Sequence, residues 1–320
     1  MRLGRSPATA AVATPDQLAM PRTFSSSRLR STLRGEKTFG YVLMAPVLVY
    51  LMLFLLYPLI LSVWFSLSNA SVEDPFSSWA GLTNFTDLWN NDSFRLALRN
   101  SFIFTFGSEV GKILLGNTLA FLLLRAFRGK KVIRALLVLP WTLPVALTTL
   151  GWLWMYDPHF SVVNWMFRTI GLGYHPNWLG EPVPAMIAVM TANIWRGFPF
   201  AAIILLAGMT SIPQDIIDSA MVDGAGFLRR FHYIIVPMIA PILFIGLLFD
   251  LVFTFTDLSV VYLLTHGGPE NTTHILPTLA FQNGINGGNL AQGAAISLFM
   301  LPVLVVAVVF MLRVLRRREI

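Results

Sequence analysis

Six long apolar runs, separated by polar segments, constrain the fold of this 320-residue chain more than any other feature. They occupy residues 39–67, 98–124, 132–156, 183–209, 235–264 and 291–312. An α-helix needs about 20 apolar residues to cross a bilayer, and each run meets that length. Because 55% of the residues are hydrophobic and only 12% are charged, the chain carries more apolar surface than one soluble core could bury. The sequence predicts an all-α, polytopic membrane protein with six transmembrane helices.

The distribution of basic residues predicts how the chain is oriented. The net charge is +7, and the basic residues gather at every second boundary between apolar runs. Such alternation is the positive-inside pattern, so both termini are expected to be cytoplasmic and residues 68–97 external. Binding to nucleic acid is disfavoured, because a folded basic face with base-stacking aromatics is not apparent. Residues 1–36 are rich in Ser, Pro and Arg, which predicts a disordered cytoplasmic tail before a transmembrane domain of residues 37–320.

Prolines interrupt most of the apolar runs. A proline removes a backbone donor and clashes with the preceding turn, so these helices are expected to kink or unwind locally. In a transporter such breaks shape a cavity near the middle of the membrane. The alternative is the ordinary tolerance of proline in membrane helices. The prolines are Pro46, Pro58, Pro140, Pro144, Pro199, Pro241 and Pro302.

Ionised side chains within the apolar runs predict a polar interior, because a lipid-facing charge is costly. Arg196 is expected to face the bundle or a cavity, where it either pairs with Asp250 or Asp257 or contacts a substrate directly. Asp250 and Asp257 are seven residues apart, close to two helical turns, and are expected to share one face. Glu109 and Lys112 are three residues apart and are expected to neutralise each other as a structural pair.

The polar segment 211–234, between the fourth and fifth runs, has a defined order of residues. It contains Asp218-Ser219-Ala220 and Asp223-Gly224-Ala225, and the next run begins with Ile235-Val236-Pro237. This order resembles the coupling loop of ATP-binding-cassette importer permeases: Glu-Ala-Ala, Asp-Gly-Ala, then an apolar stretch closing on Leu-Pro. Asp218 departs from the family's Glu and Ser219 from its Ala. The resemblance implies that Asp218, Ser219, Ala220, Asp223, Gly224 and Ala225 form the contact with the ATPase. Gly224 is expected in a turn with positive φ.

Three further segments, 193–200, 207–213 and 263–269, resemble the first-subunit permease of carbohydrate importers, similar to the maltose permease and its oligosaccharide and polyol relatives. The resemblance covers about residues 40–313 and implies a type I ABC importer permease fold. It implies substrate contacts at Gly197, Phe200, Asp250, Phe253 and Thr254, to which the neighbouring Arg196 is added for its charge. Carboxylates bind sugar hydroxyls and aromatic faces stack on sugar rings. The alternative for these residues is a packed polar ladder between helices.

The sequence also predicts that this chain works with partners. It has no Gly-x-x-x-x-Gly-Lys-Ser/Thr loop and no catalytic constellation, so it is expected not to be an enzyme. Its five histidines lack metal-ligand spacing, and neither a metal nor another cofactor is expected. The resemblance implies a cytoplasmic ATPase dimer, a second permease subunit and an extracytoplasmic solute-binding protein, in the lipid of a bacterial inner membrane.

The expected function is therefore ATP-driven import of an oligosaccharide, monosaccharide or polyol. Within the importer class, the alternative is a permease for glycerol phosphate esters or another anion, because Arg196 offers a positive charge. A channel or secondary transporter explains the apolar runs but leaves the ordered segment 211–234 unexplained. A membrane-bound enzyme lacks support from any catalytic motif.

Overall fold

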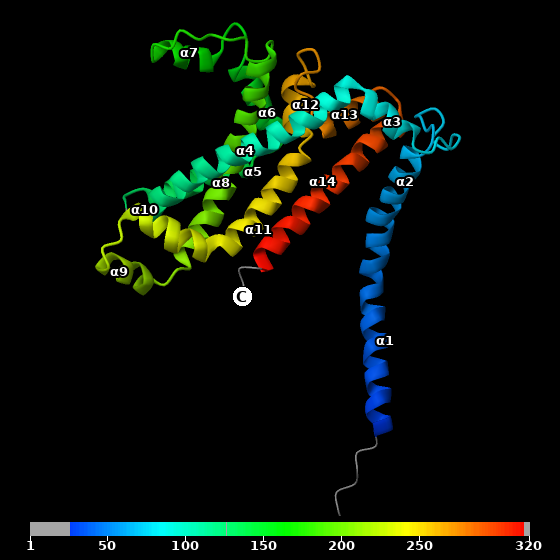
Figure 1. The fold of residues 1–320 in the computed structure, drawn as a ribbon, viewed down its shortest axis with the longest axis horizontal. Coiled ribbons are helices and arrows are strands. Elements are labelled where there is room, and N and C mark those ends of the chain that lie inside the picture. Colours follow the sequence, from blue (N-terminus) through cyan, green and yellow to red (C-terminus); the bar gives the residue numbers. More distant parts are fainter. Residues whose placement is uncertain (1–25, 126, 317–320) are drawn as a thin grey trace, which may run out of the picture. The chain divides into compact units, whose positions relative to one another are not determined.

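The computed structural model describes the backbone of residues 26–125 and 127–316, and the side-chain surroundings from residue 39 onward within those ranges. Apart from one isolated bridge between Ser68 and Trp79, the regular elements of these residues are helices (Figure 1). In chain order they are α1 (Ser26–Leu51), the π-helix η2 (Met52–Leu56), α2 (Tyr57–Ser66), α3 (Thr83–Asn90), α4 (Asp92–Leu124), α5 (Lys130–Thr142), α6 (Val145–Met155), α7 (Val162–Thr169), α8 (Pro182–Thr210), α9 (Gln214–Val222), α10 (Phe227–Arg230), η3 (Phe231–Ile235), α11 (Val236–Phe255), α12 (Ser259–Thr265), α13 (Leu276–Phe281), η4 (Gln282–Asn286) and α14 (Leu290–Arg316).

The predicted all-helical membrane architecture is confirmed. Five helical stretches of the described chain are long and apolar enough to cross a membrane, namely Phe39–Ser66, Asp92–Leu124, Pro182–Thr210, Phe227–Thr265 and Leu290–Arg316. The bent pair α5 and α6 gives a sixth when taken as one span. The second span starts earlier than the predicted residue 98, because the Oδ1 atom of Asn91 accepts hydrogen bonds from the backbone N–H groups of Ser93 (2.8 Å) and Phe94 (3.3 Å) and so caps the helix there.

The third span is broken where a proline break was expected. Helices α5 and α6 meet at an angle of 96°. Pro144 precedes α6, and Leu143 before it has extended backbone angles (φ −71°, ψ 145°), the conformation that a following proline favours. The other interior prolines act differently: α8 and α11 remain helical through Pro199 and Pro241.

The chain divides between Leu59 and Ile60 into two compact units. The predicted N-terminal tail, 1–36, falls in the first unit: residues 1–25 lie outside the described part, and the remaining residues form the first turns of α1. The tail boundary therefore lies within this helix. The predicted substrate and coupling residues all belong to the second unit.

Within the second unit, α4, α8 and α11 pack closely through glycines. A Cβ atom added to Gly116 of α4 would lie 2.9 Å from the Cβ of Ala201 on α8. One added to Gly246 of α11 would lie 2.7 Å from Cδ1 of Ile204, also on α8. Small residues allow membrane helices to approach closely enough for van der Waals packing to hold them together. These contacts make α8 the central helix against which α4 and α11 are positioned.

Apolar clusters hold the two ends of this bundle. At one end, Leu123 of α4 packs with Leu205 of α8 and Ile239 of α11, next to the connection that carries α9 and α10 (Figure 1). At the other end, Phe94 and Phe255 pack with α13 and α14. Between the two ends, polar side chains of α4 and α11 meet at Lys112 and Asp250.

The connection between α12 and α13 buries His274, which is 2% exposed. Its Nδ1 lies 3.1 Å from Oγ1 of Thr278. Burial lowers the pKa of His274 below its ordinary value, because removal from water disfavours the charged imidazolium. The folded chain therefore binds fewer protons than the unfolded chain as pH falls through about 6.5.

Stability is consequently expected to fall on acidification below about pH 6.5, by up to about 1.4 kcal/mol per pH unit for this histidine. The measurement is the thermal midpoint of the purified protein at pH 7.5 and pH 5.5. His274→Gln should reduce the difference between the two midpoints, whereas His159→Gln, at an exposed position, should leave it as in the wild type. An unchanged difference in His274→Gln would contradict the assignment.

Candidate functional site

Helix α4 carries a buried polar stripe in the middle of its apolar sequence. Thr105, Ser108, Glu109 and Lys112 are spaced three or four residues apart and are all at most 6% exposed, so they share one face of the helix. Ionisable residues inside a membrane span normally face the bundle or a water-filled cavity. The stripe therefore marks the side of α4 on which polar chemistry is possible.

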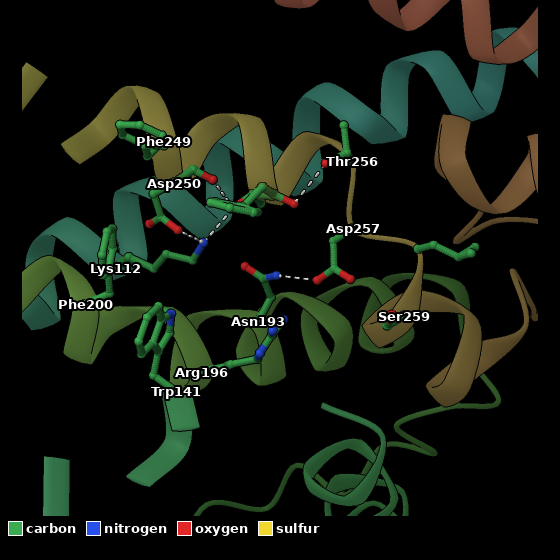
Figure 2. A pocket seen from close by; sticks show the side chains of 14 residues that line it. Lys112, Trp141, Asn193, Arg196, Phe200, Phe249, Asp250, Thr256, Asp257 and Ser259 are labelled. Carbon is green, nitrogen blue, oxygen red and sulfur yellow. Dashed lines mark hydrogen bonds and ion pairs between the residues drawn. The ribbon is translucent and has the colours of Figure 1, made fainter. Parts of the chain in front are cut away.

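Lys112 is the centre of a buried hydrogen-bond network that joins α4 to α11 (Figure 2). Its Nζ lies 3.2 Å from Oε1 of Glu109, 3.1 Å from Oδ1 of Asp250 and 2.6 Å from Oγ1 of Thr254. The predicted pairing of Glu109 with Lys112 is thus confirmed, but it is only one arm of the network. Because an ammonium group has three N–H donors, each donor of Lys112 has a partner within the protein.

The path of the Lys112 side chain depends on Gly197 of α8. A Cβ atom added to Gly197 would lie 2.5 Å from Cε and 3.0 Å from Nζ of Lys112. Such separations are below van der Waals contact, so any larger residue would push the lysine aside. Gly197 therefore provides the space beside α8 that the Lys112 side chain occupies as it extends to α11.

The predicted partners of Arg196 were wrong. Asp250 pairs with Lys112, and Asp257 accepts hydrogen bonds from Nδ2 of Asn193 (2.9 Å) and from the backbone N–H of Val260 (3.2 Å). The expected common helical face of the two aspartates also fails, since α11 ends at Phe255 and Asp257 lies in the break before α12. Among the described residues, the buried Nε of Arg196 has no hydrogen-bond partner.

These groups surround a cavity of about 500 Å³ formed by α4, α5, α8, α11 and the start of α12. Its charged lining consists of Lys112, Arg196, Asp250 and Asp257, two cations and two anions. The structure brings together on this cavity all the residues predicted to contact a substrate, namely Arg196, Gly197, Phe200, Asp250, Phe253 and Thr254. Their role in binding stays a prediction.

Aromatic rings form the apolar part of the lining (Figure 2). The rings of Phe200 and Trp141 are stacked, with centroids 5.7 Å apart and planes inclined by 15°. Phe253 lies on α11 one turn from Phe249, and its side chain is 70% exposed. The cavity therefore combines exposed aromatic faces with hydrogen-bonding groups.

The segment predicted to couple to an ATPase forms α9 and the turn that follows it. Asp218 and Ser219 are exposed on α9, and Ala220 is buried. The backbone N–H of Ala225 donates to the carbonyl of Ala220 (2.9 Å) and that of Gly224 to Met221 (3.1 Å), which is the Schellman pattern of a helix end. Gly224 has a φ of +75°, so the predicted positive-φ turn is confirmed. Contact of this segment with an ATPase stays a prediction.

A comparison with protein families identifies the chain. The family model of the "Binding-protein-dependent transport system inner membrane component" matches residues 112–320, which is more than half of the chain and includes Lys112, α8 and α11. The chain is an ABC importer permease of this binding-protein-dependent family. It is thus the non-catalytic, multi-pass membrane component of a transport system that works with a binding protein.

Relatives of this permease extend the match over most of its length. The trehalose/maltose transport system permease protein MalF of Thermococcus litoralis is 30% identical over 284 residues, 89% of this chain and 96% of the relative. The sn-glycerol-3-phosphate transport system permease protein UgpA of Pectobacterium atrosepticum is 28% identical over 282 residues, 87% of this chain and 94% of the relative.

Among solved structures, a bacterial ABC transporter involved in the import of the acidic polysaccharide alginate matches with a TM-score of 0.76 and 23% identity, over 91% of this chain and 99% of that one. The predicted membership of the maltose-permease-like family and the ABC importer permease fold are confirmed.

Several cavity residues of the permease, Trp141 and Asn193 among them, were not in the predicted set of substrate contacts, although Asn193 lies in the segment 193–200 that the sequence singled out. Trp141 lies on α5 and stacks on Phe200, and Asn193 lies one turn before Gly197 on α8. Both are polar or aromatic residues in apolar runs, a signal that is too common to select them. The charge of Lys112 was evident from the sequence. Its partners on α11, Asp250 and Thr254, could not be predicted, because they depend on how the helices pack.

Proposed function

We propose that this permease carries a neutral sugar or polyol through the cavity between α4, α8 and α11. The observation that carries the proposal is the lining: two cations balanced by two anions, with exposed aromatic faces beside them. A neutral polyhydroxylated solute offers donors to carboxylate oxygens, acceptors to a guanidinium, and ring faces that stack on aromatic side chains. The relative named as a trehalose/maltose permease supports the same class of solute.

Energy for transport is proposed to enter through the segment 211–234. We propose that a cytoplasmic ATPase dimer binds α9, that a second permease subunit forms the rest of the translocation pathway, and that an extracytoplasmic solute-binding protein delivers the solute. The basic clusters support cytoplasmic termini in a bacterial plasma membrane. Since α9 follows directly on α8, a movement of α9 would be transmitted to the helix that carries Arg196 and Gly197.

The sugar proposal is tested by removing one aromatic face. Phe253→Ala is expected to weaken equilibrium binding of maltose by about fivefold, because an aromatic contact contributes about 1 kcal/mol. Binding is measured by calorimetry on the permease complex in nanodiscs without the binding protein, so that the permease's own selectivity is read. The matched control is Phe310→Ala, which removes an equally exposed ring of α14 that does not line the cavity. Equal effects of the two variants would contradict the proposal.

A second candidate solute is a glycerol phosphate ester. It is favoured by the Nε of Arg196, which is buried without a partner, and by the glycerol-3-phosphate permease among the relatives. In that case Arg196→Gln should weaken binding of sn-glycerol 3-phosphate by at least about 100-fold, the effect of removing one partner of a buried charge pair. For a sugar permease, the wild type should bind maltose and not the phosphate ester.

A further inference from the structure

Lys112 is unusual among the cavity residues because it has no donor left for a solute. Its three N–H groups are directed to Glu109, Asp250 and Thr254, and Figure 2 marks the contact between its ammonium group and Asp250. Lys112 therefore does not donate a hydrogen bond to a solute in the cavity. It affects the solute through Thr254 and Asp250, which it holds in place.

The first consequence concerns Thr254. Its hydroxyl accepts from Lys112 and lies 2.9 Å from Oε1 of Glu109 and 2.8 Å from the carbonyl of Asp250. The side chain is 2% exposed. The hydroxyl is therefore already occupied as donor and as acceptor, so Thr254 serves the network rather than offering a free hydroxyl to a solute.

The second consequence concerns Asp250. Lys112 holds Oδ1 of this carboxylate at 3.1 Å, while Oδ2 has no partner among the described residues. The carboxylate is thus fixed in orientation, with its charge compensated and one oxygen available. Arg196 on α8 is the cavity cation whose donors are not directed at a carboxylate within the part of the chain that the structure describes.

We propose that Lys112 is a positioning residue that determines the charge class of the solute. By holding Asp250 and offsetting its negative charge, Lys112 leaves one carboxylate oxygen for a solute hydroxyl and weakens the attraction of that carboxylate for a cation. A neutral polyhydroxylated solute then donates to Asp250 and accepts from Arg196. This inference rests on the proposed function and adds to it the residue that sets its selectivity.

Gly197 provides a way to move Lys112 without changing any charge. Because an added Cβ would lie 2.5 Å from Cε of the lysine, Gly197→Ala should displace the ammonium group from Asp250. If Gly197 acts through Lys112, the same substitution should have little effect once the lysine side chain is gone. Energetic coupling of this kind is measured by a mutant cycle.

The experiment compares Gly197→Ala in the wild type and in the background Glu109→Gln/Lys112→Ala. In this background the more deeply buried of the two partner carboxyls of Lys112 is neutralised, which limits the loss of stability. Equilibrium binding of maltose is measured by calorimetry on the full permease complex in nanodiscs. We expect about tenfold weaker binding in the wild-type background, the effect of one misplaced charge-assisted hydrogen bond, and less than about twofold in the second background.

The matched control is Gly246→Ala, which creates a similar overlap, 2.7 Å, with Cδ1 of Ile204 but does not touch the lysine. Its effect should be the same in both backgrounds. The dicationic disaccharide of glucosamine provides a readout that a merely structural role would not change. It should bind the Glu109→Gln/Lys112→Ala protein about tenfold more tightly than the Glu109→Gln protein, because these two proteins differ only in the cation that faces Asp250.

The outcomes distinguish a failure of the role proposed for Lys112 from a failure of the proposed sugar transport. If Gly197→Ala weakens maltose binding equally in both backgrounds, or the cationic disaccharide gains nothing, the role of Lys112 is overturned while the sugar proposal stands. If the wild-type complex binds sn-glycerol 3-phosphate and not maltose, or binds neither, the sugar proposal and the inference built on it both fail.

Discussion

Replacing Lys112 by methionine is expected to destabilise the folded permease by about 3–5 kcal/mol, because the substitution leaves buried carboxylates without their cation. Glu109 and Asp250 both lie within 3.2 Å of the ammonium group, and the lysine side chain is 3% exposed. Methionine keeps the length and most of the volume, so the loss is one of charge rather than of packing. The measurement is the thermal midpoint of the purified complex, which should fall by roughly 10 °C.

The control variant removes the two carboxylate charges together with the lysine. In Glu109→Gln/Lys112→Met/Asp250→Asn no charge remains in the network, and most of the lost stability should return, since a buried ion pair and its neutral replacement are often similar in stability. A Lys112→Met protein that melts at the wild-type temperature would contradict the network. A triple variant no more stable than Lys112→Met would show that packing, not charge, is what the lysine contributes.

Gly224→Val is expected to reduce ATP-driven uptake by at least about tenfold while the complex still assembles in the membrane. The φ of +75° at this position lies in a region that a β-branched residue avoids, at a cost of order 1–3 kcal/mol. The turn after α9 should therefore rearrange and displace Asp223 and Ala225 from the surface proposed to meet the ATPase. Uptake is measured in proteoliposomes loaded with ATP, together with the ATPase rate.

Gly226→Val is the matched control for this coupling prediction. Neither Gly224 nor Gly226 has an atom within 4 Å of an added Cβ, so space is equal and backbone conformation is the difference. Gly226 has a φ of −65°, which valine adopts readily. Normal coupled uptake by Gly224→Val, or an equal loss in both variants, would contradict the idea that this turn transmits the motion of the ATPase.

The spans of this permease could be predicted because lipid imposes a simple rule on sequence. Each span needs about 20 apolar residues, and the break in the third run follows from Pro144, which lacks a backbone donor. Gly224 was predictable for a similarly local reason, since a sharp turn favours the residue without a side chain. In these cases the information lies within a few consecutive residues.

The charge pairing was not predictable, because it depends on residues far apart in the chain. Lys112 and Asp250 are 138 positions apart, and the path of the lysine side chain requires the space that Gly197 leaves on a third helix, α8. Helical periodicity suggested that Asp257 shares a face with Asp250, but that argument holds only while the helix continues, and α11 ends two residues before Asp257. The resemblance to carbohydrate permeases identified residues that line the cavity. It could not show which of their polar groups, such as the hydroxyl of Thr254, already have hydrogen-bond partners within the protein.

The central claim is tested most directly by the ATPase activity of the reconstituted complex with its binding protein, titrated with maltose, trehalose, glycerol and sn-glycerol 3-phosphate. We predict stimulation by a neutral sugar or polyol and none by the phosphate ester, because two cations and two anions line the cavity. Stimulation by the phosphate ester alone would contradict it and would make the unpaired Arg196 the residue that selects the solute.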